Sequence, residues 1–342
     1  MVMDREDKPE ERERLLCLHP DTGELRWEKH WPVTYGSMGG YSTGPRTTVL
    51  QIAELGYSLG ATGRLICFEL ETGKVRWELD AVKDLGAVMP QWGYAGSPVL
   101  HEGKLLVHLG LKDGKGSVVA LDPATGTKLW TGGKDAAGYS APQPYQKGVL
   151  QWGPNLVEAF SASDGTALWS YPYEITYGVS IAQPLIVGDL ALVSGYWHGT
   201  KVFKLSDPKN VVLVWENEKE ICGLMASPLE KDGIVYLLDK QHGFTAFRLA
   251  DGKILWRDDH LLTPKDRNPQ ISIVWLDRAK GIIAGLNAIG ELVFATVTPE
   301  GISEIGRHQI IGKTWAHPAF VSNRIYARSD SEIVAWELWP KD

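Results

Sequence analysis

The sequence has few cysteines and no long apolar run. Its three cysteines, Cys17, Cys67 and Cys222, are widely spaced and odd in number, so they give neither a disulfide framework nor a CxxC metal site. We interpret them as small buried apolar residues. No apolar run reaches the roughly 18 residues that a membrane-spanning helix needs. The sequence therefore favours neither a disulfide-stapled domain nor a helical membrane protein.

The sequence also lacks common signatures of catalysis and nucleotide binding. No HExxH, P-loop or GxGxxG pattern occurs in it. His101 and His108 lie close in sequence, and we interpret them as turn and strand residues rather than as a metal pair. A formal charge of −7 argues against nucleic acid or an anionic membrane surface as the main partner. What remains is an ordinary globular composition, with 44% hydrophobic and 23% charged residues.

Tryptophan, by contrast, is abundant and marks an internal repeat. Five copies align: CLHPDTGELRW (17–27), CFELETGKVRW (67–77), ALDPATGTKLW (120–130), AFSASDGTALW (159–169) and AFRLADGKILW (246–256). In each copy a small residue or cysteine comes first, a glycine follows in the turn and a tryptophan ends the unit. The alternation before the turn is typical of a strand, and the glycine supplies a residue that tolerates positive φ. The tryptophan can then pack its flat face against the neighbouring unit.

A second pattern precedes the copies, in which a proline introduces a short strand, a turn and an apolar strand. These prolines are Pro45, Pro98, Pro142, Pro184, Pro228 and Pro318. Each unit thus contains four short antiparallel strands, and the radial arrangement of such sheets is a β-propeller. We predict an all-β fold with one propeller domain over residues 1–342. Eight blades with an incomplete first blade are favoured; seven blades, closed by residues 14–29, are the alternative.

The two ends of the repeat array differ from its middle. Residues 1–13 are interpreted as a charged N-terminal loop or as a truncated blade strand, and the charge run 6–14 as a solvated loop. The first residues do not read as a signal peptide, and we expect an N-terminal piece with the export signal to be missing. The last blade is expected to lack its outer strand. One turn of helix is predicted at residues 80–86.

The A-x-D-x-x-T-G-x-x-x-W unit, clearest at residues 120–130, resembles the tryptophan-docking motif of the PQQ-like (pyrroloquinoline-quinone-like) β-propellers. The resemblance covers residues 14–338. One branch of this family comprises quinoprotein dehydrogenases that bind PQQ and Ca²⁺ on the propeller axis. Another is non-catalytic and includes the lipoprotein of the bacterial outer-membrane assembly machinery. The chain is most similar to exported PQQ-binding-like repeat proteins, which implies a periplasmic or other extracytoplasmic location. The resemblance implies structural docking roles for Trp27, Trp77, Trp130, Trp169, Trp215 and Trp256.

The dehydrogenase branch sets requirements that the sequence does not meet. Those enzymes carry an adjacent pair of cysteines over the cofactor ring, and this chain has no such pair. They also need Glu, Asn and Asp oxygens around Ca²⁺. Asp239 and Asn287 are the nearest candidates, and we interpret both as turn residues. We therefore expect no bound cofactor and no metal, with PQQ and Ca²⁺ as the alternative.

The loops that enter each innermost strand are the predicted ligand site, because in propellers they converge on the axis. Aromatic residues recur there beside glycines and offer stacking faces and hydroxyl donors to a polar, planar or sugar-like ligand. The predicted ligand-binding residues at this channel mouth are Tyr41, Arg46, Gln91, Trp92, Tyr94, Tyr139, Tyr177, Gln183, Trp315 and His317. The alternative is that Gly-Tyr is a repeat feature that packs one blade on the next. A guanidinium buried at Arg46 would require an anionic ligand or an acidic partner.

Two further turns combine polar and aromatic residues. Trp197 and His198 end a strand in GYWHGT, where they suit either a blade rim or a ligand site. Residues 240–242, Lys-Gln-His, are interpreted as a solvated hairpin turn.

We therefore predict a monomeric binding or scaffold propeller without chemistry of its own. It would engage a protein, peptide or glycan at the channel mouth or at its blade edges. The alternative is an enzyme, either a PQQ/Ca²⁺-dependent quinoprotein dehydrogenase or a carbohydrate-active enzyme, with its site among the same tyrosines and with Arg46 and His317.

Overall fold

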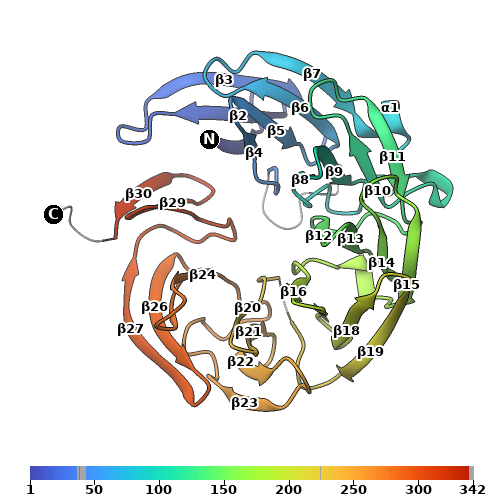
Figure 1. Cartoon of the computed structure of the whole chain (residues 1–342). Helices are drawn as coiled ribbons and strands as arrows, with labels where there is room; N and C mark the ends of the chain where they lie inside the picture. Colours follow the sequence, from blue (N-terminus) through green and yellow to red (C-terminus); the bar gives the residue numbers. More distant parts are fainter. Residues whose placement is uncertain (37, 39–43, 224, 339–342) are drawn as a thin grey trace. The chain divides into compact units, whose positions relative to one another are not determined.

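The structure, a computed structural model that describes residues 1–36, 38, 44–223 and 225–338, consists almost entirely of β-strands (Figure 1). Its strands form eight antiparallel sheets, each built from consecutive strands. The fold is an eight-bladed β-propeller, as the favoured interpretation of the repeat predicts. The chain divides into two compact units, Met1–Ser180 with Pro208–Asn210 and Ile181–Asp207 with Val211–Asp342.

The first unit contains four blades. The first blade has the strands β1 (Val2–Glu6), β2 (Arg12–Leu18) and β3 (Leu25–Pro32). The second has β4 (Leu50–Ile52), β5 (Leu55–Leu59), β6 (Arg64–Glu69) and β7 (Val75–Asp80), followed by helix α1 (Ala81–Leu85). The third has β8 (Val99–His101), β9 (Lys104–His108), β10 (Val118–Leu121) and β11 (Lys128–Gly132), with the short 3₁₀ helix η2 (Lys112–Gly114). The fourth has β12 (Gln143–Tyr145), β13 (Gly148–Trp152), β14 (Leu156–Ser161) and β15 (Ala167–Pro172), followed by η3 (Thr176–Gly178).

The other four blades contain the strands β16 to β30. The fifth has β16 (Leu185–Val187), β17 (Leu190–Gly195), β18 (Gly199–Asp207) and β19 (Asn210–Asn217). The sixth has β20 (Leu229–Lys231), β21 (Ile234–Asp239), β22 (Gly243–Arg248) and β23 (Ile254–Arg257). The seventh has β24 (Ile271–Asp277), β25 (Ile282–Asn287), β26 (Glu291–Thr298) and β27 (Gly301–Gln309). The last has β28 (Ala319–Val321), β29 (Arg324–Arg328) and β30 (Ile333–Glu337).

The first and last blades each have three strands in the described part of the chain, as the sequence predicts for incomplete end blades. The charge run interpreted as a solvated loop instead includes the start of β2, which pairs with both β1 and β3. Arg14 is bonded to Asp4 across the β1–β2 pair (2.8 Å), and Glu13 is fully buried. Residues 7–11 of the run form the connection between β1 and β2, whereas residues 12–14 belong to the sheet, where Arg14 pairs with Asp4.

The third blade shows how the repeat unit folds. Val118 and Ala120 on β10 are fully buried and belong to a core cluster with Leu106 on β9. After β10 the Asp122 carboxylate accepts hydrogen bonds from the N–H groups of residues 124 and 125, which closes the turn. Gly126 then adopts a φ of +72°, as the turn pattern predicts. A bulge between residues 120 and 121 sets the register of β11.

Helix α1 confirms the predicted helical turn. Asp80 caps its N-terminus by accepting from the N–H groups of Val82 and Lys83. Gly86 ends it in the left-handed conformation, with a φ of 73°. The helix forms part of the segment between β7 and β8, which also carries predicted ligand residues.

The three cysteines carry no disulfide. Cys67 and Cys222 are buried and Cys17 is half-buried. Cys67 is a member of the core cluster that also contains Tyr57 and Leu65. Burial raises the pKa of the Cys67 thiol, so it remains protonated at neutral pH. The predicted burial is confirmed for Cys67, whereas Cys17 is only half-buried.

Candidate functional site

Three of the predicted ligand residues lie together in the first unit. Arg46, Trp92 and Tyr139 each occupy the segment that precedes the first strand of its blade. The Arg46 guanidinium donates from Nη1 to the carbonyl oxygen of Trp92 (2.7 Å). The Trp92 and Tyr139 ring centroids are 5.9 Å apart, with the rings tilted by 50°. We call these three residues the Arg46 cluster.

The backbone holds the segments of this cluster against one another. Thr48 N–H donates to Ser97 Oγ (2.9 Å), which joins the segments before β4 and β8. Trp92 N–H donates weakly to Tyr139 Oη (3.4 Å), which joins the segments before β8 and β12. A Cβ on Gly96 would lie 2.7 Å from the Ser140 carbonyl oxygen, so this close approach needs glycine. The cluster is therefore built from the segments that precede the first strands of three consecutive blades.

Buried groups of the first blade surround the Arg46 side of the cluster. The Glu13 carboxylate accepts from Tyr35 Oη (2.6 Å), Trp31 Nε1 (3.1 Å) and Ala61 N–H (2.9 Å). Burial raises the pKa of Glu13, although these hydrogen bonds oppose the shift. Burial also lowers the pKa of Arg46, while Tyr35, Tyr139 and Glu13 act in the opposite sense. The cluster thus contains a half-buried cation whose guanidinium is bonded to a backbone carbonyl oxygen.

A buried polar layer adjoins Tyr139. Its N–H donates to the Ser180 carbonyl oxygen (3.0 Å). His108 is 1% exposed, and its Nδ1 lies 3.2 Å from the Ser140 carbonyl oxygen and 2.9 Å from Gln151 Nε2. Burial lowers the pKa of His108, so its ring is neutral at pH 7. His108 is a packed strand residue, as the sequence predicts.

Tyr139 is 8% exposed, and Tyr94 is the most deeply buried of the predicted ligand residues in the described part of the chain. It is 1% exposed and belongs to the core cluster of the second and third blades. Its hydroxyl donates to the Leu109 carbonyl oxygen (3.3 Å), and its ring lies against Gly63. Burial raises the pKa of Tyr94. These contacts match the alternative interpretation, in which a Gly-Tyr pair packs one blade on the next.

Gln91 and Tyr177 are the exposed members of the predicted set in the first unit. Gln91 precedes Trp92 and is exposed. Tyr177 is 70% exposed, and its φ of 59° lies in the left-handed region, which is uncommon for a tyrosine. This strained backbone holds a large aromatic side chain toward solvent within η3.

The remaining predicted ligand residues belong to the second unit or to segments outside the described residues. Gln183 precedes β16 and is half-buried. Trp315 is half-buried and His317 exposed before β28. Tyr41 lies outside the described residues, as do the central residues of the pattern Gly-Tyr-Ser-Thr-Gly at 40–44. That pattern has the GxSxG form, which sequence reasoning overlooked; it signals a nucleophile only at a strand-to-helix turn.

The repeat tryptophans lie against glycine turns. The Trp77 indole donates to the Pro123 carbonyl oxygen (2.9 Å), and a Cβ on Gly126 would lie 2.8 Å from its ring. The same donation joins Trp27 to Leu70 (3.1 Å), Trp215 to Leu249 (2.8 Å) and Trp256 to Thr298 (2.8 Å). The Trp130 ring also lies against a glycine, Gly165, but its Nε1 has no hydrogen-bond partner among the described residues. Trp130 and Trp169 are the more buried of the set, at 8% exposed.

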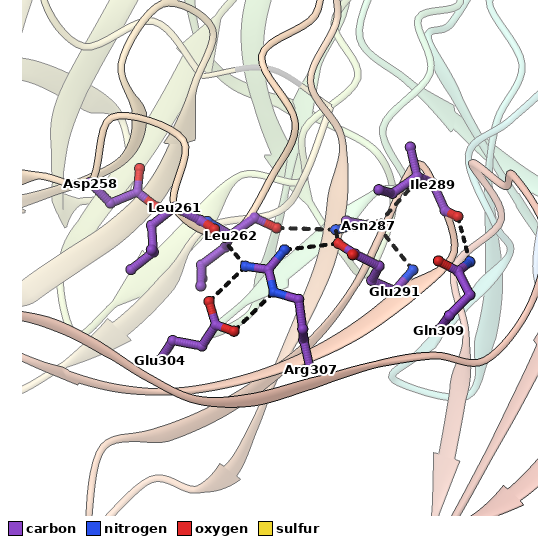
Figure 2. Close-up of polar contacts among 9 residues, drawn as sticks. All are labelled: Asp258, Leu261, Leu262, Asn287, Ile289, Glu291, Glu304, Arg307 and Gln309. Carbon is purple, nitrogen blue, oxygen red and sulfur yellow. Dashed lines mark hydrogen bonds and ion pairs between the residues drawn. The ribbon is translucent and has the colours of Figure 1, made fainter.

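An ion-pair network in the second unit joins the sixth and seventh blades. Figure 2 shows Arg307 on β27 between Glu304 and Glu291. Arg307 also donates to the Leu261 carbonyl oxygen (2.8 Å) in the segment after β23. Asn287 bridges the same segments by donating to Glu291 (2.8 Å) and to Leu262. The network is saturated by its own members and acts as a clamp between blades.

A family model described as outer membrane protein assembly factor BamB matches residues 11–258 and 155–341. The two matches together span nearly the whole chain. The chain belongs to this family. Its repeats are those of the PQQ-like β-propellers, as the resemblance in the sequence indicates. No curated protein matches the sequence significantly.

Solved structures of this propeller class share the fold. BamB from Moraxella catarrhalis is 15% identical with a TM-score of 0.65, over 98% of each chain. A quinohemoprotein alcohol dehydrogenase from Comamonas testosteroni is 14% identical with a TM-score of 0.65, over 92% of this chain and 67% of that one. A europium-containing methanol dehydrogenase is 11% identical with a TM-score of 0.63, over 95% and 79%. At these identities the likeness concerns the fold alone.

The two residues named as nearest candidates for Ca²⁺ ligands, Asp239 and Asn287, are engaged within the fold. Within the described part of the chain, no group of three His, Cys, Asp or Glu side chains could hold a metal. The Asp239 carboxylate accepts from the N–H groups of Cys222, Gln241 and His242, so it stabilises a turn. Asn287 belongs to the blade clamp. Neither residue offers oxygen atoms for a hard cation.

Among the described residues, no helix has the length and the apolar character to cross a membrane.

Sequence reasoning missed the buried groups beside the Arg46 cluster. Glu13 lies in a charged run and Tyr35 outside any repeat copy, so neither carried a signal of burial. Sequence reasoning also missed the contact between two turns of the second unit. The sequence does contain a pattern that predicts this contact. YWHG at 196–199 and KQHG at 240–243 occupy equivalent turns of consecutive blades.

Proposed function

We propose that this chain is a binding and scaffold propeller without chemistry of its own, and that it engages a protein partner through the Arg46 cluster. The observation that carries the proposal is the Arg46 guanidinium, held by the Trp92 carbonyl oxygen, together with the contact between the Trp92 and Tyr139 rings. Arginine, tryptophan and tyrosine are the residues that most often dominate binding energies at protein interfaces. An anionic group of the partner suits this cation.

The family supports a protein partner over a glycan. Its model is described as an outer membrane protein assembly factor, which names a role in assembling other proteins. We therefore propose an extracytoplasmic location for this chain, and a monomeric propeller domain over residues 1–342. The exposed residues Gln91 and Tyr177 would extend the contact surface of the first unit.

The six repeat tryptophans have a different role in this proposal. Four of their indoles, those of Trp27, Trp77, Trp130 and Trp215, lie against glycine turns. Four donate to backbone carbonyl oxygens. They would dock each blade on its neighbour and stay out of the partner interface.

Site-specific photocrosslinking tests the proposal. A photoreactive amino acid at position 91, beside the cluster, should capture one protein in the cells that produce this chain. The adduct should be lost when Arg46→Ala is introduced into the same chain. Position 204, an exposed lysine on β18, is the matched control and should give no such adduct. Equal adducts from both positions would contradict the proposal.

An enzymatic role would contradict it as well. Purified protein incubated with PQQ and Ca²⁺ should bind neither stoichiometrically and should show no dye-linked oxidation of alcohols or sugars. A stoichiometric PQQ complex with turnover would replace the binding role by the dehydrogenase alternative.

A further inference from the structure

Two turns of the second unit that are equivalent in the repeat form a joint aromatic and cationic surface. Tyr196 and Trp197 lie in the turn between β17 and β18, and Lys240 lies in the turn between β21 and β22. Strand pairing ends at Gly195 with Gly199 in one blade and at Asp239 with Gly243 in the next. Tyr196 and Lys240 thus occupy the same register position of consecutive blades.

The contacts within this surface are specific. The Lys240 ammonium lies 3.8 Å from the centroid of the Tyr196 ring and 5.5 Å from that of Trp197. The two rings meet edge to face, with centroids 4.1 Å apart. Tyr196 Oη donates to Asn268 Oδ1 (2.6 Å) and to the Arg267 carbonyl oxygen (3.2 Å), so the segment before β24 joins the two turns. We call Tyr196, Trp197, Lys240 and Arg267 the Trp197 patch.

The patch presents one large aromatic side chain to solvent in a fixed orientation. Trp197 is 44% exposed, whereas Tyr196 and Lys240 beneath it are half-buried. The cation–π contact and the Tyr196 hydrogen bonds pre-orient the patch, which reduces the entropy lost on binding. An exposed tryptophan on such a support is typical of a recognition site.

The charge near the patch differs in sign from that of the chain. Arg267 is exposed, and the half-buried Lys240 ammonium lies over the Tyr196 ring. Of the neighbouring carboxylates, Asp259 is paired with Lys265 (2.9 Å). Asp239 is buried and accepts from backbone N–H groups. Asp266 is exposed and its carboxylate accepts from the Arg267 N–H. The patch itself contributes two cations, Lys240 and Arg267, on a chain with a net charge of −7.

We propose that the Trp197 patch binds an acidic peptide segment of a partner protein that carries an aromatic side chain. The partner's aromatic side chain stacks on the Trp197 indole, and its carboxylates bond to Lys240 and Arg267. A neutral sugar would use the indole but gain nothing from the two cations. The patch belongs to the second unit, so the proposal is independent of the Arg46 cluster.

Fluorescence anisotropy with a labelled peptide tests it. The probe is a fluorescein-labelled hexapeptide of glutamate, aspartate and tyrosine. It should bind the full chain, and binding should weaken as NaCl rises from about 50 to about 300 mM. Trp197→Ala and Lys240→Ala should each weaken binding about tenfold, whereas Lys240→Arg should retain most of it because the cation remains. Ile289→Ala, an exposed side chain in the corresponding turn of the next blade, is the matched control and should change nothing.

The outcomes separate this surface from the Arg46 cluster. Binding that survives Trp197→Ala and Lys240→Ala but is lost in Arg46→Ala would overturn the proposal and assign the peptide to the Arg46 cluster. Equal binding of a lysine-containing version, or binding of chitotriose without the peptide, would overturn it too. Circular dichroism and thermal unfolding of each variant establish that a loss of binding is not a loss of fold.

Discussion

Trp77 and Trp197 illustrate two uses of tryptophan in one fold. Trp77 follows a glycine turn in the repeat, donates to the Pro123 carbonyl oxygen (2.9 Å) and covers Gly126 of the next blade. Trp197 lies in a turn outside that motif, supported from below and 44% exposed. The first is fixed by a contact that recurs in other blades, and the second by contacts found in one place. Position in the repeat therefore separates a tryptophan that packs on the neighbouring blade from one that is exposed in a turn.

The largest effect is expected at a repeat tryptophan. Trp77→Ala should lower the free energy of unfolding by about 3 kcal/mol, the lower end of the range for Trp→Ala because the ring is partly exposed. The ring's contact with the glycine turn and one hydrogen bond are lost together. Urea unfolding of the variant beside the wild type measures the loss. If Trp77→Ala lowered the free energy of unfolding by less than about 1 kcal/mol, Trp77 and Trp197 would no longer differ in their structural role.

Glu13 extends the comparison to a buried polar group. Glu13→Gln should lower the free energy of unfolding by about 1–3 kcal/mol, because the amide nitrogen cannot accept from Trp31, whereas the carboxyl oxygen it replaces can accept even when protonated. Glu158→Gln, another carboxylate whose pKa burial raises, provides a second case.

The pH dependence of this loss has a defined sign. The folded pKa of Glu13 is raised above its usual 4.5 by burial, so its stabilising contribution is complete below that pH and is lost as pH rises through the folded pKa. The gap between wild type and Glu13→Gln should therefore be widest near pH 4 and narrow toward pH 7. Urea unfolding at several pH values checks this. If the difference in unfolding free energy between wild type and Glu13→Gln widened with pH, ionisation of the buried Glu13 would not destabilise the fold.

A smaller difference in the free energy of unfolding is expected between the Trp→Phe variants of two repeat tryptophans. Trp77→Phe removes an indole hydrogen bond to Pro123, whereas the Trp130 indole has no partner among the described residues. Removing an unpaired buried N–H relieves a cost, so Trp130→Phe should destabilise by about 1 kcal/mol less than Trp77→Phe. Thermal unfolding of the pair measures the difference. A larger loss for Trp130→Phe would mean that packing outweighs the hydrogen bond at these contacts.

The sequence predicted what the repeat encodes and little of what departs from it. The glycine at position 126, the tryptophan at 77 and the helical turn after Asp80 follow from local patterns with known geometry. Arg46, Trp92 and Tyr139 were expected near each other because each precedes the first strand of a blade. Tyr94 also precedes the first strand of a blade, but its ring packs into the core. The sequence pattern does not indicate whether a side chain points into the core or toward solvent.

Contacts that cross between segments were harder to predict. Glu13 stands in a charged run, and only the sheet formed by β1, β2 and β3 shows that its side chain is buried. Lys240 was interpreted as a solvated turn residue because its partner Tyr196 lies in another blade. Aligning the two turns on Gly199 and Gly243 would have found the pair.

Trp197→Ala should have the smallest effect on stability and so provides the sharpest test of the comparison. The side chain lies in a surface turn, half exposed, and the Tyr196 hydrogen bonds remain after its removal. We expect a change within about 0.5 kcal/mol, the range of ordinary surface substitutions. Beside a loss of about 3 kcal/mol in Trp77→Ala, this would separate a recognition tryptophan from a structural one by stability alone. If Trp197→Ala unfolds as readily as Trp77→Ala, the turn is itself a joint between the fifth and sixth blades, and its exposed ring needs no ligand to explain it.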